Sequence, residues 1–165
     1  MASVEIKGLN KCVYWLRVLG QNVDGIIDNS LKESANIIKQ EVEENVRKVT
    51  ASYNGHTYKA VDTGDLLRSI TVNKLGLCRY AVVATAEHSI YVEFGTSIAG
   101  DPAVAHTTRP KWVYYNENVG EYRTAYPQPP RPYMRPAFVA RKNTVILNMI
   151  LHVKRAAANS YGGEL

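Results

Sequence analysis

The stretch VDGIIDNSLKESANIIKQEVEENV, residues 23–46, decides the fold class of this chain. Its apolar side chains recur at steps of three or four residues, and they are Val23, Ile27, Leu31, Ala35, Ile38, Val42 and Val46. This spacing predicts a long amphipathic α-helix with one apolar stripe and a charged opposite face. Gly25 and the Asp28-Asn29-Ser30 cluster leave open a helix that breaks or starts near residue 28. Upstream, residues 9–19 also follow helical spacing until Gly20 interrupts them.

Downstream of the long helix the pattern changes from helical to extended. Residues 51–65 are rich in turn-forming residues and predict a loop, in which Asp62 or Thr63 could cap a short helical turn. Three strands are predicted after this loop, because β-branched and aromatic residues alternate or dominate there. They span residues 69–72, 80–85 and 90–95. A last helix is predicted through Phe138 and Val153.

These elements together predict an α+β domain. Its mainly antiparallel sheet would have the long N-terminal helix and the C-terminal helix packed on one face. One domain over residues 1–165 fits the chain length, and residues 159–165 should fray. The 45% hydrophobic and 21% charged residues are typical of a folded protein, and no apolar run is long enough to span a membrane. The formal charge of +5 permits contact with nucleic acid or an acidic surface without requiring either.

Residues 97–128 differ in kind, because prolines and aromatic residues crowd them. Two aromatic-rich runs, 111–115 and 121–126, flank a loop ending at Gly120 and predict a β-hairpin. Its large aromatic side chains are Trp112, Tyr114, Tyr115, Tyr122 and Tyr126. They could pair across the strands, form a contact surface for another subunit, or stack on nucleic acid. The hairpin's near-neutral charge makes nucleic acid the weakest of the three.

A proline-rich segment, residues 126–136, connects the hairpin to the last helix. Its PxxP-like spacing could be a polyproline ligand, but a stiff connector that aims the helix is the favoured interpretation. Arg131 and Arg135 lie on this segment, and planar guanidinium groups hold carboxylates with two hydrogen bonds. A fixed ion pair between subunits and a plain surface role therefore both fit these arginines.

No pattern in the chain is typical of catalysis, cofactor binding or metal binding. The histidines are isolated from one another, at His56, His88, His106 and His152. Asp62, Asp65 and Glu93 could form a carboxylate cluster for acid–base or metal chemistry. A turn around Gly64 and the polar face of a strand account for them better. We expect no catalytic residue, no cofactor and no metal.

Three stretches, taken in order, resemble the tail-completion or neck proteins of long-tailed bacteriophages. They are DTGDLLRSI (62–70), YVEFGT (91–96) and PRPYMRPAF (130–138), and the opening VEIKGL (4–9) is also similar. The positions that carry the resemblance are Thr63, Gly64, Tyr91, Glu93, Phe94, Gly95, Pro132 and Pro136. Gly64 and Gly95 would permit turns that other residues resist, and Tyr91 and Phe94 would anchor the sheet.

The resemblance implies a structural, non-enzymatic virion protein that assembles in the host cytoplasm. Such subunits join or complete the tail at the head–tail interface as rings around the DNA channel. Their partners would be further copies, neighbouring neck proteins and the tail tube, while DNA passes without sequence-specific binding. The tail terminators, rings that cap the tail tube, are similar in size and layout and remain an alternative. A DNA-binding module and a hydrolase with an unrecognised site are the other two alternatives.

One departure from the family concerns the region between the second and third motifs. Typical members connect them by a short loop, whereas about thirty residues, the insertion at about 97–128, intervene in this chain. The insertion could contact a neighbouring ring or the tail tube.

Overall fold

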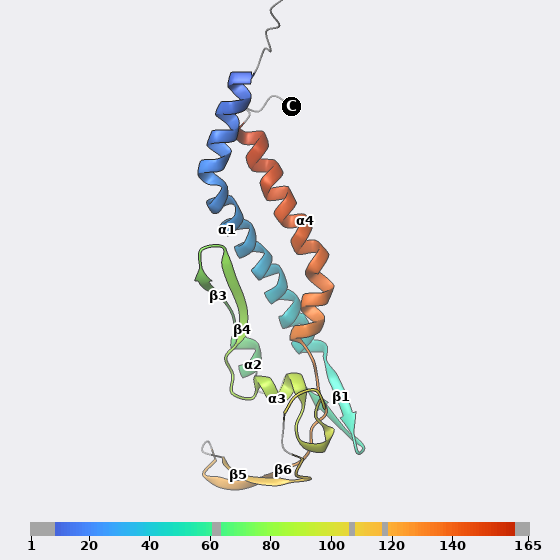
Figure 1. Cartoon of the computed structure of the whole chain (residues 1–165). Helices are drawn as coiled ribbons and strands as arrows, with labels where there is room; N and C mark the ends of the chain where they lie inside the picture. The colour runs from blue at the N-terminus through green and yellow to red at the C-terminus, as the bar shows by residue number, and fades with distance from the viewer. Residues whose placement is uncertain (1–8, 61–63, 106–107, 117–118, 161–165) are drawn as a thin grey trace, which may run out of the picture. The chain divides into compact units, whose positions relative to one another are not determined.

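The computed structural model describes residues 9–60, 64–105, 108–116 and 119–160 (Figure 1). The helices are α1 (Leu9–Lys48), α2 (Asp65–Arg68), α3 (Ser89–Phe94), the short 3₁₀ helix η1 (Ser97–Ala99) and α4 (Met134–Ser160). The strands are β1 (Thr50–Tyr53), β2 (His56–Lys59), β3 (Ile70–Gly76), β4 (Arg79–Ala84), β5 (Trp112–Asn116) and β6 (Glu121–Ala125). Within the described ranges, no helix has the length and apolar content needed to cross a membrane.

The α+β class with long first and last helices is confirmed, but the described strands do not form one sheet. They form three separate two-stranded ladders, β1–β2, β3–β4 and β5–β6. Tight turns close the first two. Asn54 and Gly55 have φ of 50° and 80°, as a two-residue hairpin turn requires, and Cys78 has φ of 53° in the β3–β4 turn. Each ladder is therefore a local hairpin.

The chain divides into two compact units. One comprises Met1–Ile37, Val72–Ala81 and Lys142–Leu165, and the other comprises Ile38–Thr71 and Val82–Arg141. We call them the helical unit and the motif unit, because the second contains the three quoted motifs. Both long helices and the β3–β4 hairpin run from one unit into the other.

The apolar core of the motif unit is assembled from segments that are distant in sequence. Its buried members are Val42, Val46, Ala60, Leu66, Ile70, Val92, Tyr133 and Ala137. Val42 and Val46 are the C-terminal end of the predicted apolar stripe, and both are fully buried. The stripe therefore identified the face of α1 on which the motifs fold.

In the helical unit, polar side chains join α1 to its neighbours. The Asn148 amide on α4 donates to the Ser30 carbonyl at 3.3 Å and to Ser34 Oγ at 3.2 Å. Asp28 accepts from Lys74 Nζ at 2.6 Å and from the Cys78 N–H at 3.1 Å, which ties the β3–β4 hairpin to α1.

Helix α1 does not break near residue 28, because the polar groups there are used elsewhere. Asp28 binds the β3–β4 hairpin, and Ser30 Oγ donates to the Ile27 carbonyl of its own helix at 2.9 Å. The helix also continues through Gly20 and Gly25 from Leu9.

Three further predictions need correction. The predicted loop at 51–65 contains the β1–β2 hairpin, and Asn159 and Ser160 still belong to α4. Residues 90–95, predicted as a strand, form most of α3, since that turn of helix buries Val92 and Glu93 together while Ile90 faces solvent. The proposed capping residues Asp62 and Thr63 lie outside the described residues, and Gly64 occupies the cap of α2 with φ of 81°.

Candidate interaction site

The Glu93 carboxylate on α3 caps the first turn of α4. Its Oε2 accepts from the backbone N–H groups of Tyr133 and Met134 at 2.7 and 2.9 Å, and its Oε1 from that of Arg135 at 3.2 Å. The first N–H groups of a helix have no partner within the helix, and the helix dipole favours negative charge at that end. The prediction that Glu93 lies on the polar face of a strand is therefore wrong, because it is buried as a helix cap. This contact brings the second and third motifs together.

Tyr133 also connects the start of α4 to α3. Its ring is 2% exposed, and its hydroxyl donates to the Ser89 carbonyl of α3 at 3.3 Å. Burial, with the nearby charge of Glu93, raises the pKa of Tyr133 to about 12, so the hydroxyl stays protonated and remains a donor. The Asn45 amide of α1 donates to the Tyr133 carbonyl at 3.2 Å. The start of α4 is thus fixed to both α1 and α3.

Arg131 is buried within the subunit and not displayed at its surface, with 4% of it exposed. Its Nη1 donates to the Lys59 carbonyl at 3.1 Å and its Nη2 to Gln128 Oε1 at 2.7 Å. The guanidinium also lies 5.7 Å from the centre of the Tyr58 ring, and burial lowers the pKa of Arg131. We therefore assign Arg131 to the internal framework, because its two terminal nitrogens bind the β1–β2 hairpin and the connector.

Gly95 permits the chain to pass the connector at very short range. It has φ of +72°, and a Cβ there would lie 2.6 Å from the Gln128 carbonyl oxygen and 2.8 Å from the Pro130 nitrogen. Next to it, the Thr96 N–H donates to the Gln128 carbonyl at 2.8 Å, and Gln128 N–H donates to Thr96 Oγ1 at 3.0 Å. The two ends of the 97–128 insertion are therefore held side by side.

Arg135 occupies the rim of this junction. Its guanidinium donates to Asp101 at 2.9 Å, lies 3.9 Å from Glu93 and covers the Phe94 ring at 5.5 Å. Its side chain is 61% exposed, so Arg135 remains accessible at the surface, unlike Arg131. Asp101 also accepts from the Ala103 N–H, so the first turn of the insertion is attached to the start of α4.

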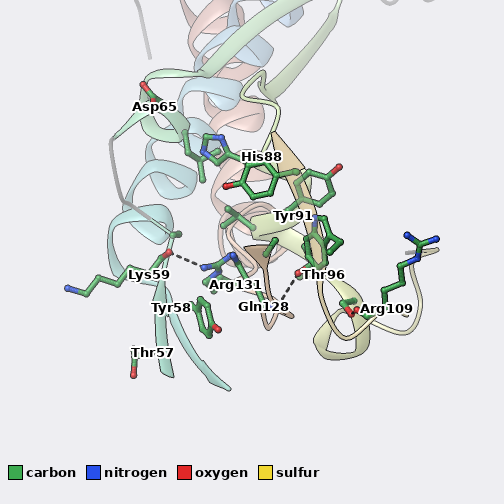
Figure 2. Close-up of a pocket in the computed structure, with 18 of the residues that line it drawn as sticks. Thr57, Tyr58, Lys59, Asp65, His88, Tyr91, Thr96, Arg109, Gln128 and Arg131 are labelled. Carbon is green, nitrogen blue, oxygen red and sulfur yellow. Dashed lines mark hydrogen bonds between the residues drawn. The ribbon is translucent and has the colours of Figure 1, made fainter. Parts of the chain in front are cut away.

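An open groove of about 1480 Å³ lies beside this junction (Figure 2). Its walls come from β2, α3, the turn at Thr96 and Ser97, and the β5–β6 hairpin. Its charged lining residues are Lys59, Arg109, Arg131 and a single described acid, Asp65, and of the three bases only Arg131 lies centrally in Figure 2. A groove this wide and open suits a segment of polypeptide better than a small substrate.

The β5–β6 hairpin divides its aromatic residues between two faces. Trp112 and Tyr114 line the groove, and Tyr115, one residue on, belongs to the other face. Tyr115 pairs with Tyr122 across the strands, with ring centres 5.2 Å apart at 63°, and Tyr122 is 77% exposed. Tyr126 follows β6 and is exposed as well. Cross-strand pairing and an exposed aromatic face thus occur in the same hairpin.

The remaining motif residues lie in several environments. Tyr91 is 56% exposed on α3, so it does not anchor a sheet, whereas Phe94 is half-buried beneath Arg135. Pro132 is half-buried and Pro136 is exposed at the start of α4. Thr63 lies outside the described residues.

Three residues that the sequence did not single out are hydrogen-bond partners of motif residues. Asn45, Ser89 and Gln128 each hold a motif residue, but an isolated polar residue on a helix or loop gives no signal of its distant partner.

No described group of three or more His, Cys, Asp or Glu residues could hold a metal ion. Asp65 pairs with Arg68 on α2, and His152 pairs with Glu33. His106 lies outside the described residues.

Comparison with known proteins finds one family match, which covers part of the chain. Residues 16–95 match the model of a family described as "Bacteriophage HK97-gp10, putative tail-component". No curated protein and no solved structure gives a significant match. The matched segment contains the first motif and all of the second except Thr96, while the third motif and the hairpin lie beyond it. Over residues 16–95 the chain is therefore similar to the HK97-gp10-like tail components of bacteriophages, which confirms the resemblance to phage tail and neck proteins indicated by its motifs.

Proposed function

We propose that this protein is a non-enzymatic subunit of the phage neck, which joins or completes the tail at the head–tail interface as part of a ring around the DNA channel. The family match supports a tail component. The observation that carries the finer proposal is the exposed aromatic face of the β5–β6 hairpin.

This face needs a partner for physical reasons. A hairpin of two strands is marginally stable in water when nothing covers it. Here Val113, Tyr115 and Tyr122 remain 65%, 52% and 77% exposed, although tyrosine is enriched at the centres of protein interfaces. We assign this face, which we call the outer hairpin face, to contact with a neighbouring virion subunit.

The attachment of the hairpin supports the same role. Thr96 and Gln128 pair at its base, and Arg135 binds Asp101 just inside the insertion. A contact surface held at both ends loses less conformational entropy on binding than a free loop does.

The ring follows from the kind of contact proposed. The outer hairpin face and the groove are different surfaces of one subunit. When the outer hairpin face of one copy binds the groove of the next, the contact repeats head to tail and forms a ring where the rotation closes. Further copies, neighbouring neck proteins and the tail tube are the proposed partners, with the protein located in the virion. The polar groups of the motifs support a structural role, since Glu93 caps α4, Arg131 is buried against β2 and Gln128, and Asp65 pairs with Arg68.

The test combines imaging with complementation. Phage carrying a stop codon in this gene would be complemented by the wild-type protein, by Tyr115→Ser/Tyr122→Ser, or by the control Leu75→Ser/Leu77→Ser. The control also removes two exposed apolar side chains, 58% and 65% exposed, but on the β3–β4 hairpin. We expect joined particles with the wild type and the control, and separate heads and tails with the tyrosine variant.

Electron cryomicroscopy of the complemented particles distinguishes a position in the neck from a position at the end of the tail tube. A closed ring of this chain between portal and tail tube supports the neck proposal. A ring that caps the tail tube itself would favour the tail terminator alternative, and a neck fully explained by other chains would refute both.

A further inference from the structure

Among the described residues of the helical unit, none covers one face of α4. Four half-buried residues face α1, namely Val145, Asn148, Met149 and His152. Two of them contact α1 directly, since Asn148 binds Ser30 and Ser34 and the His152 ring lies 2.7 Å from Glu33. At 100° per residue, the opposite side of the helix is centred near residues 143, 147 and 150.

Large apolar side chains are exposed on and around this opposite side, together with the polar Asn143 and Lys154. Ile146, Leu147, Ile150, Leu151 and Val153 are 47%, 60%, 44%, 49% and 45% exposed. A helix at the surface of a globular protein is apolar on one face only, and a helix that is apolar all round is normally buried. The exposed side of α4 in the helical unit therefore lacks the cover that its composition requires.

The spacing on this side indicates that the cover is a helix. Asn143, Ile146, Ile150 and Val153 follow one another at steps of three, four and three, which is the alternation of core positions in a coiled coil. We call these four residues the α4 seam. An asparagine at a core position costs stability but fixes the register of the partner helix, so Asn143 would select one alignment.

Charge decides what kind of helix fits. Helix α4 carries five basic residues and no Asp or Glu. Lys142 and Lys154 flank the seam, about 60° to either side of it, and are exposed. A second copy of α4 would bring the same positive charges to the seam, whereas carboxylates beside the seam would attract them.

We propose that the exposed side of α4, around the seam and residues 142–155, docks an amphipathic helix of another protein whose apolar stripe is flanked by Asp and Glu. This surface is separate from the outer hairpin face. It gives the protein a second contact that does not depend on ring formation.

The test uses the full-length protein and two labelled helical peptides of about three heptads. Both carry Leu at the core positions; one carries Glu and the other Lys at the flanking positions. Fluorescence anisotropy measures binding. We expect the Glu peptide to bind at least about tenfold more tightly than the Lys peptide, and Ile146→Ser/Ile150→Ser to weaken it by a further factor of about ten. Lys142→Glu/Lys154→Glu should reverse the preference between the peptides.

Several outcomes would overturn the proposal. The Glu peptide must bind, and Leu75→Ser/Leu77→Ser must bind it as the wild type does. Equal binding of the two peptides, or of the wild type and the isoleucine variant, would remove the proposal. Concentration-dependent sedimentation that is lost in the isoleucine variant would assign the face to a second copy, and stronger binding to anionic vesicles than to the peptide would assign it to a lipid surface. All of these readouts are made without phage, so failure here leaves the neck proposal to be tested by complementation.

Discussion

Replacing Glu93 by alanine should destabilise the protein more than any other single loss of a carboxylate among the described residues. The substitution removes the acceptor of three backbone N–H groups at the start of α4, in a site where Glu93 is 5% exposed. Losing a helix cap costs about 0.5–2 kcal/mol, and a hydrogen bond to a charged group contributes about 1.5–3 kcal/mol. Three coupled bonds do not add fully, so we expect a loss of about 3–4 kcal/mol.

That loss is large against the stability of an ordinary domain, about 5–15 kcal/mol. For a chain of this length it corresponds to a fall in Tm of roughly 6–16 °C. Urea unfolding followed by circular dichroism measures the free energy, and Glu93→Gln should lose less than Glu93→Ala because it keeps one acceptor oxygen. Glu87→Ala is the matched control. Glu87 is exposed just before α3, the helix that carries Glu93, and its loss should change stability by less than about 0.5 kcal/mol. A loss below about 1 kcal/mol in Glu93→Ala would refute the capping role.

Three further predictions test other parts of the structure. Gly95→Ala should cost several kcal/mol in urea unfolding, of order 2–4, because the added Cβ meets backbone atoms at 2.6 Å in a left-handed conformation. Tyr115→Ser/Tyr122→Ser should cost only about 1 kcal/mol, since both rings are largely exposed, so its assembly defect would be one of contact and not of folding. Lowering the pH should loosen the β3–β4 hairpin, which amide hydrogen exchange at Cys78 would detect.

The sign of the pH effect follows from Asp28. Its hydrogen bond to Lys74, followed by those from Cys78 and Tyr80, lowers the pKa of this carboxyl in the folded state. The stabilisation is therefore complete above the usual pKa of an aspartate and is lost as the pH falls through the lowered value. Asp28→Asn should remove this dependence. Exchange at Cys78 that is unchanged on acidification, relative to Asp28→Asn, would contradict it.

The control for Gly95 is Gly120. It also has positive φ, +74°, but the nearest atom to an added Cβ, the Tyr115 hydroxyl oxygen, is 3.8 Å away. Gly120→Ala should therefore cost only the backbone strain, about 1 kcal/mol. Equal effects at the two glycines would show that close approach to the connector is not what requires Gly95.

The long elements could be predicted because their signal is periodic and repeated. The stripe ending at Val42 and Val46 gave the buried face of α1, and the apolar spacing after Phe138 gave α4. The β1–β2 hairpin was missed although Asn54-Gly55 is a strong two-residue turn signal, because its strands of four residues are too short to show a pattern.

The junction between the motifs could not be predicted, because its causes are distant in sequence. Residues 90–95 have strand-like composition, yet they form a helix that buries Glu93 against N–H groups forty residues away. The sequence placed Arg131 at the surface or in a subunit contact. In the structure it is buried, and its acceptors are a carbonyl in β2 and the side chain of Gln128. Tertiary contacts decided both cases, and local propensity carries no information about them.

The pairing of Thr96 with Gln128 closes the base of the insertion, so the insertion forms a separate loop on the motif unit. These residues are 32 positions apart in sequence but adjacent in space, so the body of the motif unit is already closed at this point. The entropy of closing a loop changes only with the logarithm of its length, and shortening this one to about four residues would gain roughly 2 kcal/mol. We therefore expect that this segment can be lengthened, shortened or replaced by a foreign sequence between residues 102 and 127 without rebuilding the core.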